Sequence, residues 1–76
     1  MMRRYHINVF WHDADDCWVA DVPDLTACSA FGDTPEQALA EVEVAMAGWL
    51  AAAEEAKLEI PQARYRPEIY TTRFAA

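Results

Sequence analysis

The chain is poor in glycine, in cations and in long apolar runs. Its two glycines, Gly32 and Gly48, cannot form the glycine-rich loop that cradles phosphate groups in nucleotide-binding proteins. Lys and Arg together number 6, against 13 Asp and Glu. Residues 5–63 hold all but one of those acids and a single base, Lys57. Such an acidic body repels phosphate backbones, which argues against nucleic-acid binding through the main fold. Two interpretations stay open, a solubilising surface and a site for a basic partner.

No apolar run is long enough to cross a bilayer, and Arg3 and Arg4 lead directly into an alternating segment instead of a signal-peptide pattern. We therefore expect a cytoplasmic protein whose two cysteines are reduced thiols. A chain of 76 residues is expected to form one domain, over residues 1–76. A domain of this size buries only about 60% of the surface that its unfolded chain exposes.

Residues 34–56 predict one long helix. Thr34 suits the N-cap, Pro35 fits the first helical position, and Gln37 lies where the return bond of a capping box originates. Beyond that start, apolar residues recur at steps of three and four, which is the spacing of one helical stripe. The stripe consists of Ala38, Leu39, Val42, Ala45, Met46, Trp49, Leu50 and Ala53. Such a stripe must pack against another element, and the rest of the chain is predicted to be strand.

The side chains of residues 4–12 are expected to point alternately to two sides, one of them apolar, and this pattern predicts the first strand. The side chains expected to face the helix are Tyr5, Ile7, Val9 and Trp11, and those expected to face away are His6, Asn8, Phe10 and His12. A polar turn over 13–16 leads to a second strand over 17–22, and a third follows over 27–31. Gly32 is then expected to permit the bend into the helix.

Residues 66–73 alternate loosely and predict a fourth strand at an edge of the sheet, because Pro67 lies within them. The expected fold is therefore α+β, with the order β-β-β-α-β. It has a small, mostly antiparallel sheet in spatial order 3-2-1-4 and one long helix packed on one face. Since one helix covers one face, Phe10, Val19 and Phe31 are expected to be exposed on the other. That exposure predicts a homo-oligomer, a dimer or a tetramer.

The sequence offers no catalytic or metal-binding pattern, so we expect no catalytic residue, metal or cofactor. His6 and His12 lie on one side of one strand, about 20 Å apart at strand rise, which is too far to share an ion. The 13–16 turn lacks the Gly and the trailing Glu of an EF-hand loop.

The two cysteines are also not expected to pair. In a hairpin that places Val22 opposite Ala27, Cys17 lies opposite Gly32 and Cys28 opposite Asp21, which separates the two sulfurs too widely for a disulfide. Small buried thiols are the expectation.

A distinctive motif joins the second strand to the helix. It begins Val22-Pro23-Asp24-Leu25-Thr26-Ala27-Cys28 and continues, after Ser29-Ala30-Phe31, with Gly32-Asp33-Thr34-Pro35-Glu36-Gln37-Ala38-Leu39. This run resembles the HicB-type antitoxin family, in which a Pro-Asp-Leu turn, a Gly-Cys pair, a short strand and a Gly-Asp-Thr helix start follow one another. Trp49-Leu50 and Ile60-Pro61 also match the family's helix end and exit, so the likeness extends from Tyr5 to Pro61. Ala27 stands where the family usually has Gly.

The resemblance implies a partial RNase H-like fold without the metal-binding acids of the nucleases. It implies a protein that neutralises a small, basic HicA-type toxin by covering the catalytic His and the RNA-binding surface of that mRNA-cleaving protein. Many family members also carry a C-terminal DNA-binding segment. Fifteen residues follow Pro61 here, too few for a helix-turn-helix domain, so DNA binding is not expected.

Three functional hypotheses follow. The first is a non-enzymatic antitoxin domain that binds a basic toxin through its acidic surface. The residues predicted to make that contact are Asp13, Asp15, Asp16, Trp18 and Asp24. The second is a stand-alone, oligomeric HicB-like domain without a toxin. The third is a degenerate RNase H-like hydrolase, which requires several acids converging on Mg²⁺.

Overall fold

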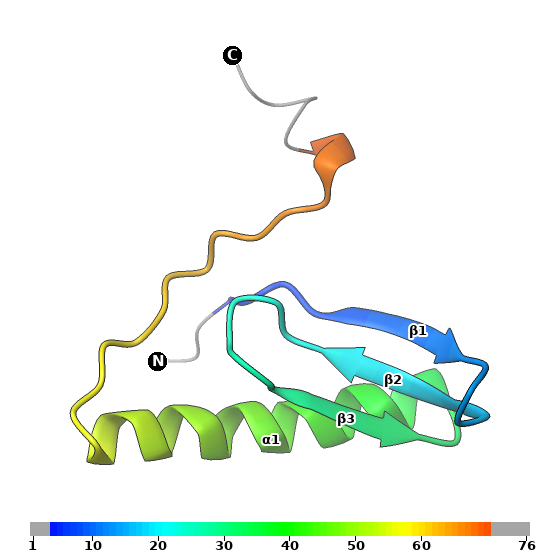
Figure 1. Cartoon of the computed structure of the whole chain (residues 1–76), viewed down its shortest axis with the longest axis horizontal. Helices are drawn as coiled ribbons and strands as arrows, with labels where there is room; N and C mark the ends of the chain where they lie inside the picture. The colour runs from blue at the N-terminus through cyan, green and yellow to red at the C-terminus, as the bar shows by residue number, and fades with distance from the viewer. Residues whose placement is uncertain (1–3, 71–76) are drawn as a thin grey trace.

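Three antiparallel strands and one long helix form the body of the protein. The computed structural model describes residues 4–70. Its elements are β1 (Asn8–His12), β2 (Cys17–Asp21), β3 (Ser29–Gly32) and α1 (Pro35–Glu55). The sheet has the order β1-β2-β3, and α1 covers one of its faces (Figure 1). The α+β class and the antiparallel meander are therefore confirmed. No helix within residues 4–70 combines the length and the apolar character needed to cross a membrane.

The start of α1 agrees with the capping residues predicted from sequence. Thr34 has an extended backbone, and its hydroxyl accepts a hydrogen bond of 3.0 Å from the N–H of Gln37. The Gln37 side chain in turn accepts a bond of 2.6 Å from the N–H of Asp33, one residue before the cap. Pro35 follows at the first helical position, where its missing N–H costs nothing.

The helix ends in a Schellman motif in which Lys57 holds the position that glycine usually occupies. Lys57 has a φ of 59°, and its N–H bonds the carbonyl of Glu54 at 3.1 Å. The next N–H, that of Leu58, bonds the carbonyl of Ala53 at 2.9 Å. These two bonds satisfy carbonyls that a helix end would otherwise leave unpaired.

The core lies between α1 and the helix-facing side of β2 and the neighbouring loop. Ala38, Val42 and Met46 form its helical side at steps of four. The buried residues of this core are Tyr5, Ala20, Val22, Leu25, Cys28, Ala38, Val42 and Met46. Leu39, predicted as part of the stripe, is instead 38% exposed. Leu39 is the residue after Ala38, so its side chain is turned about 100° around the helix, onto a side of α1 that the narrow sheet does not cover.

Gly32 has a different role from the predicted one. Its φ is not in the left-handed region, so the position does not need glycine for a bend. A Cβ at this position would instead lie 2.5 Å from the backbone N of Ala38 and 2.9 Å from the carbonyl carbon of Gln37. Gly32 is therefore required because the end of β3 runs directly against the first turn of α1.

The register between β2 and β3 differs by one residue from the predicted one. Trp18 pairs with Gly32, and the N–H of Val22 bonds the carbonyl of Cys28 at 2.9 Å. The extra residue is accommodated by Ala27, which has a φ of 59°. Since a shift of one residue exchanges the two faces of a strand, Cys28 points into the core.

The sheet face opposite α1 is apolar at its centre. The register places Phe10, Val19 and Phe31 side by side across the three strands. Phe10 is 42% and Phe31 is 59% exposed, in agreement with the sequence-based expectation, but Val19 is only 6% exposed. Val19 lies on the central strand, where the side chains on both neighbouring strands shield it.

β1 is less covered by the helix than the alternating pattern predicted. Tyr5 and Ile7 contribute to the core, whereas Val9 is 38% and Trp11 is 44% exposed. The reason is that α1 packs mainly against β3 and β2, so the helix-facing side of β1 projects beyond it. β1 is also an edge strand, with β2 as its neighbour on one side.

The residues after α1 form an extended arm, here called the C-terminal arm (residues 58–70), and do not confirm the predicted fourth strand. Arg66 and Pro67 lie outside any strand, and 68–70 form a helical turn with the N–H of Tyr70 bonded to the carbonyl of Pro67 at 2.9 Å. The rest of that predicted strand, 71–73, lies outside the described residues. The arm crosses the body beside residues 5 and 6, where the Tyr5 hydroxyl donates to the carbonyl of Pro61 (Figure 1).

Candidate partner-binding surface

The turn between β1 and β2 gathers three of the five residues predicted to contact a partner. Asp13, Asp15 and Asp16 are all exposed at the end of the sheet. The turn is closed by the N–H of Asp16, which bonds the carbonyl of Asp13 at 3.3 Å. Asp16 adopts a φ of 54°, a left-handed conformation that Asp tolerates better than most residues. The geometry therefore projects three carboxylates from one short, fixed loop.

Two tryptophans lie beside this turn. Trp11 and Trp18 pack edge to face, with ring centroids 5.6 Å apart at an angle of 72°. The indole N–H of Trp11 donates to the Asp13 carboxylate at 2.8 Å, which fixes the ring against the turn. Trp18, the predicted aromatic contact, is half-buried against the core, and Trp11 is the more exposed of the two. Sequence reasoning missed Trp11 because its position in the alternation assigned it to the helix interface.

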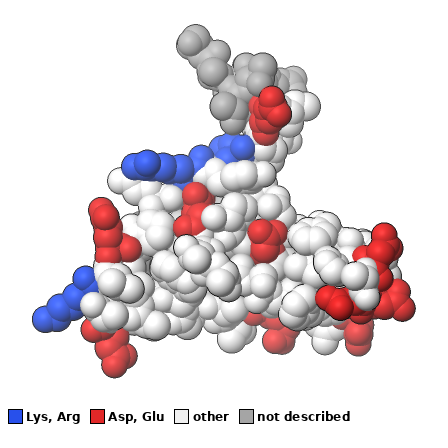
Figure 2. All heavy atoms as spheres, viewed as in Figure 1, with Lys and Arg blue, Asp and Glu red and all other residues white. Residues whose placement is uncertain are grey.

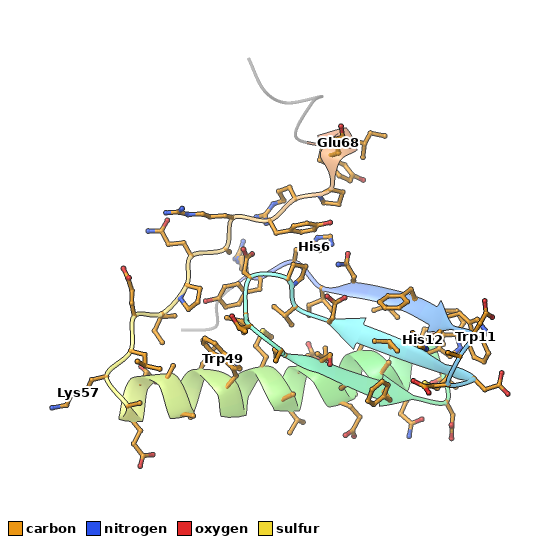
Figure 3. The ribbon with its side chains drawn as sticks, viewed as in Figure 1. His6, Trp11, His12, Trp49, Lys57 and Glu68 are labelled. Atoms are coloured by element: carbon orange, nitrogen blue, oxygen red, sulfur yellow. The ribbon has the colours of Figure 1, made fainter. Side chains whose placement is uncertain are left out.

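His12 completes the end of β1. Its Nδ1 lies 3.5 Å from a carboxylate oxygen of Asp15, and its ring centroid lies 6.4 Å from that of Phe10. His6, the other histidine, precedes β1 and lies far from His12 (Figure 3). Its Nε2 contacts the Asn8 side chain at 2.7 Å, and its ring centroid lies 4.9 Å from that of Tyr65. Within residues 4–70, no three His, Cys, Asp or Glu side chains are grouped as metal ligands.

The thiol nearest the turn is held in its protonated form. Partial burial raises the pKa of Cys17, and the carboxylates of Asp15, Asp16 and Asp33 raise that pKa further. Burial alone raises the pKa of Cys28. Both cysteines are free, and neither is a good nucleophile, because the thiolate is the reactive form.

Asp33 is a member of this surface that the sequence did not single out. Asp33 is exposed just before α1. From the end of the neighbouring strand β3, its charge raises the pKa of Cys17. We refer to Asp13, Asp15, Asp16 and Asp33 together as the acidic end. Its position is set by the pairing of β2 with β3, which brings residue 33 beside residue 17. The predicted register already placed Cys17 opposite Gly32, so the sequence held the signal that locates Asp33 at this end of the sheet.

Asp24 does not belong to this surface. It lies in the loop between β2 and β3, at the other end of the strands from the 13–16 turn. Its carboxylate accepts hydrogen bonds from the backbone N–H of Arg64, at 3.2 Å, and of Tyr65, at 3.1 Å. The predicted contact set is therefore divided between two ends of the sheet, and Asp24 anchors the C-terminal arm.

Charge is distributed unevenly over the molecule. Figure 2 shows carboxylates gathered at the end of the sheet that carries the turn, others over the rest of the face in view, and Lys or Arg side chains along the C-terminal arm and at the far end of the molecule. Within the described part of the chain, the one close contact between a basic and an acidic side chain is that of His12 with Asp15, and it is an ion pair only when the imidazole is protonated. The carboxylates of the acidic end are therefore not neutralised by Lys or Arg among those residues. Such a surface favours a cationic partner and steers it electrostatically.

A comparison with protein families gives a match over residues 5–71 to a family described as the HicB_like antitoxin of bacterial toxin-antitoxin system. No curated protein matches the chain, and no solved structure does either. The RNase H-like likeness of the fold consequently stays a prediction. Because the match spans most of the chain, from the first core residue to the C-terminal arm, this protein belongs to the HicB-like antitoxin family of bacterial toxin–antitoxin systems.

Proposed function

We propose that this protein is a non-enzymatic antitoxin that binds and neutralises a small, basic, mRNA-cleaving toxin of the HicA type. The observation that carries the proposal is the acidic end, where Asp13, Asp15, Asp16 and Asp33 project without a Lys or Arg partner in residues 4–70. An RNA-cleaving toxin needs a cationic surface to hold its substrate, so the same surface is complementary to these carboxylates. Inhibition by covering that surface requires no catalytic group in the antitoxin.

The proposed contact is centred on the three aspartates of the turn, with the Trp11–Trp18 pair as its aromatic neighbour. Exposed tryptophans beside fixed charges are common at the energetic centres of interfaces. Since an mRNA-cleaving toxin acts on translated messages, we place the complex in the cytoplasm.

The test begins with the reading frames next to that of this chain, one of which we expect to encode a small basic protein; that protein is the probe. We expect the wild-type chain to restore the growth of cells that express this protein and to co-purify with it. In the triple variant Asp13→Asn, Asp15→Asn, Asp16→Asn, the shape of the turn is kept and three charges are lost. Because close charge pairs across an interface carry well over 1 kcal/mol each, affinity should fall by roughly tenfold or more.

The matched control removes three charges elsewhere. Glu41, Glu43 and Glu54 are exposed on α1 and are not members of the acidic end. The triple Gln variant at these positions has the same net charge as the Asn variant and should bind with nearly unchanged affinity. Equal losses in the two triple variants would mean that only overall charge matters, and the proposed surface would be wrong. A wild-type chain that neither binds nor neutralises the neighbouring protein would remove the toxin from the proposal and favour a stand-alone domain.

A further inference from the structure

The sheet face opposite α1, here called the outer face, has a row of apolar side chains at its centre. Phe10, Val19 and Phe31 lie side by side across the three strands. Val19 is buried between its neighbours, and the two rings are accessible, with exposed fractions of 42% for Phe10 and 59% for Phe31. Aromatic side chains that are exposed side by side in this way are typical of the centre of a protein–protein interface.

Carboxylates flank this row in both directions along β2. Toward the 13–16 turn, the next outer-face position of β2 is Cys17, and the strand pairing brings Asp33 beside it. In the other direction, the next outer-face position is Asp21, which is half-buried. Positions 17 and 21 are four residues apart, which is about 14 Å at strand rise. None of the three strands contains Lys or Arg, so the outer face has an apolar centre between two acidic ends.

A hollow lies next to Asp21, in the loop between β2 and β3. Its volume is about 330 Å³, and its lining includes Asp21, Thr26 and Ser29. Within residues 4–70, Asp21 forms no ion pair. A hollow of this size accommodates the side chain of an Arg or Lys from another molecule, and the carboxylate and the two hydroxyls supply acceptors for its N–H groups.

We propose that the outer face binds the same cationic toxin, with its apolar centre on Phe10 and Phe31 and with an Arg or Lys of the toxin in the hollow beside Asp21. This inference rests on the proposed function and adds a second face to the contact, because Trp18 packs against the core on the side of α1. The two surfaces meet at Asp33, which belongs to the acidic end and borders the outer face. The complementary surface of the toxin then has an apolar patch between two cationic groups about 14 Å apart.

Charge favours a cationic partner over a second copy on this face. If two copies of the chain met through their outer faces, the apolar rows would cover each other, but each acidic end would lie against an acidic end of the other copy. Like charges placed against each other across an interface are strongly unfavourable. A basic protein covers the same aromatic rings and pairs with the carboxylates on both sides of them.

The first test changes the apolar centre and measures binding to the small basic protein of the neighbouring reading frame by calorimetry. Phe31→Lys places a cation against a cationic partner and removes an aromatic contact, so the dissociation constant should rise about tenfold or more. The matched control is Val44→Lys, because Val44 is 70% exposed on α1 and the substitution gives the same net charge. This control should bind like the wild type. The melting temperature of each variant reports whether it is folded.

The second test changes the hollow. Asp21→Asn keeps the shape of the side chain and removes the charge that the toxin's Arg or Lys would meet, so the dissociation constant should again rise about tenfold. Glu41→Gln is its control, since Glu41 is exposed on α1 and the loss of charge is equal. The affinity of this control should stay close to that of the wild type.

The outcomes separate this inference from the proposed function. A wild-type chain that does not bind the neighbouring protein would overturn both. If the triple Asn variant of the turn loses affinity but Phe31→Lys or Asp21→Asn binds like the wild type, the toxin is bound by the acidic end alone and only the outer-face proposal is wrong. If Phe31→Lys instead lowers the mass of the free protein in solution and leaves the toxin affinity unchanged, a second copy covers the outer face, and the proposal is again wrong.

Discussion

Ala27 carries a conformation that suits glycine. Its φ of 59° lies in the left-handed region, which costs an L-residue roughly 1–2 kcal/mol. Ala27→Gly should remove this strain. The gain is partly offset by the greater freedom of glycine in the unfolded chain, so the free energy of unfolding should rise by about 1 kcal/mol. Urea denaturation of the two proteins measures this difference.

The control for that prediction is Ala14→Gly in the turn between β1 and β2. Ala14 is exposed and has no positive φ, so glycine relieves no strain there and should lower stability by a few tenths of a kcal/mol, roughly. Shifts of the same sign and size in both variants would show that the backbone of Ala27 is not strained.

The two thiols should differ in reactivity. The raised pKa of Cys17 reflects partial burial and the nearby carboxylates of Asp15, Asp16 and Asp33, and that of Cys28 reflects burial. Near pH 8, Ellman's reagent should therefore modify Cys17 several-fold more slowly than the same thiol in the urea-unfolded chain, and Cys28 should react last. The Asp13, Asp15 and Asp16 triple Asn variant should speed the reaction of Cys17 and leave Cys28 unchanged. Equal rates in folded and unfolded protein would contradict this protection.

The raised pKa values of the two thiols also determine how their contribution to folding stability changes with pH. A thiol whose pKa is raised on folding favours the native state fully below its unfolded pKa, which is about 8.5. As the pH rises through the raised value, the unfolded chain has lost protons that the folded chain still holds. The contribution of the thiols to stability is therefore lost in alkali and is unaffected by acid.

At the level of the elements, the C-terminal arm depends on Asp24. The carboxylate accepts the backbone N–H groups of Arg64 and Tyr65, and Tyr65 in turn packs against His6. Asp24→Ala leaves these N–H groups without their acceptor, and bonds to a charged group are worth about 1.5–3 kcal/mol each. We expect amide hydrogen exchange at residues 64 and 65 to accelerate more than tenfold, while the exchange of α1 amides stays unchanged.

Asp24→Asn is the graded control for the arm. An amide oxygen still accepts hydrogen bonds but has no charge, so exchange at residues 64 and 65 should be intermediate between the wild type and Asp24→Ala. If Asp24→Ala leaves exchange there as slow as in the wild type, the arm is held by other contacts, such as that of Tyr5 with Pro61.

The elements differ in how far local sequence determines them. Thr34, Pro35 and Gln37 are enough to place the start of α1, because capping depends on neighbours in the chain. The register of β3 could not be derived in the same way, since it depends on an alanine that adopts an unfavourable φ. The C-terminal arm resembled a strand by its alternation, but its actual partners, Asp24 and Tyr5, lie far away in sequence.

The candidate surface, too, is determined partly by local sequence and partly by contacts between distant residues. The three aspartates of the 13–16 turn are evident from composition, because a polar turn between two strands must be exposed. Asp33 and Trp11 join them only through the pairing of strands and through the offset of α1 toward β3. Asp24 had the right charge for the predicted contact, but its carboxylate is occupied within the fold.

At the scale of the whole molecule, the formal charge of −7 has two opposite consequences for the effect of salt. Carboxylates that repel one another destabilise the free protein, whereas the same carboxylates attract a cationic toxin. At 0.1 M salt, the interaction between exposed charges is largely screened beyond roughly 10 Å. Raising NaCl should therefore stabilise the free chain, by about 0.5 kcal/mol, while it weakens the complex with the toxin.

The two effects can be measured side by side by thermal unfolding of the free chain and by calorimetry of the complex over the same salt series. The triple Asn variant of the turn separates them further, because it should bind with a shallower salt dependence than the triple Gln variant of α1, although both have lost three charges. This difference arises only if the lost charges face the partner, since bulk charge is equal in the two proteins. A complex that tightens with salt would show that apolar contacts dominate it, and the acidic end would then have a solubilising role alone.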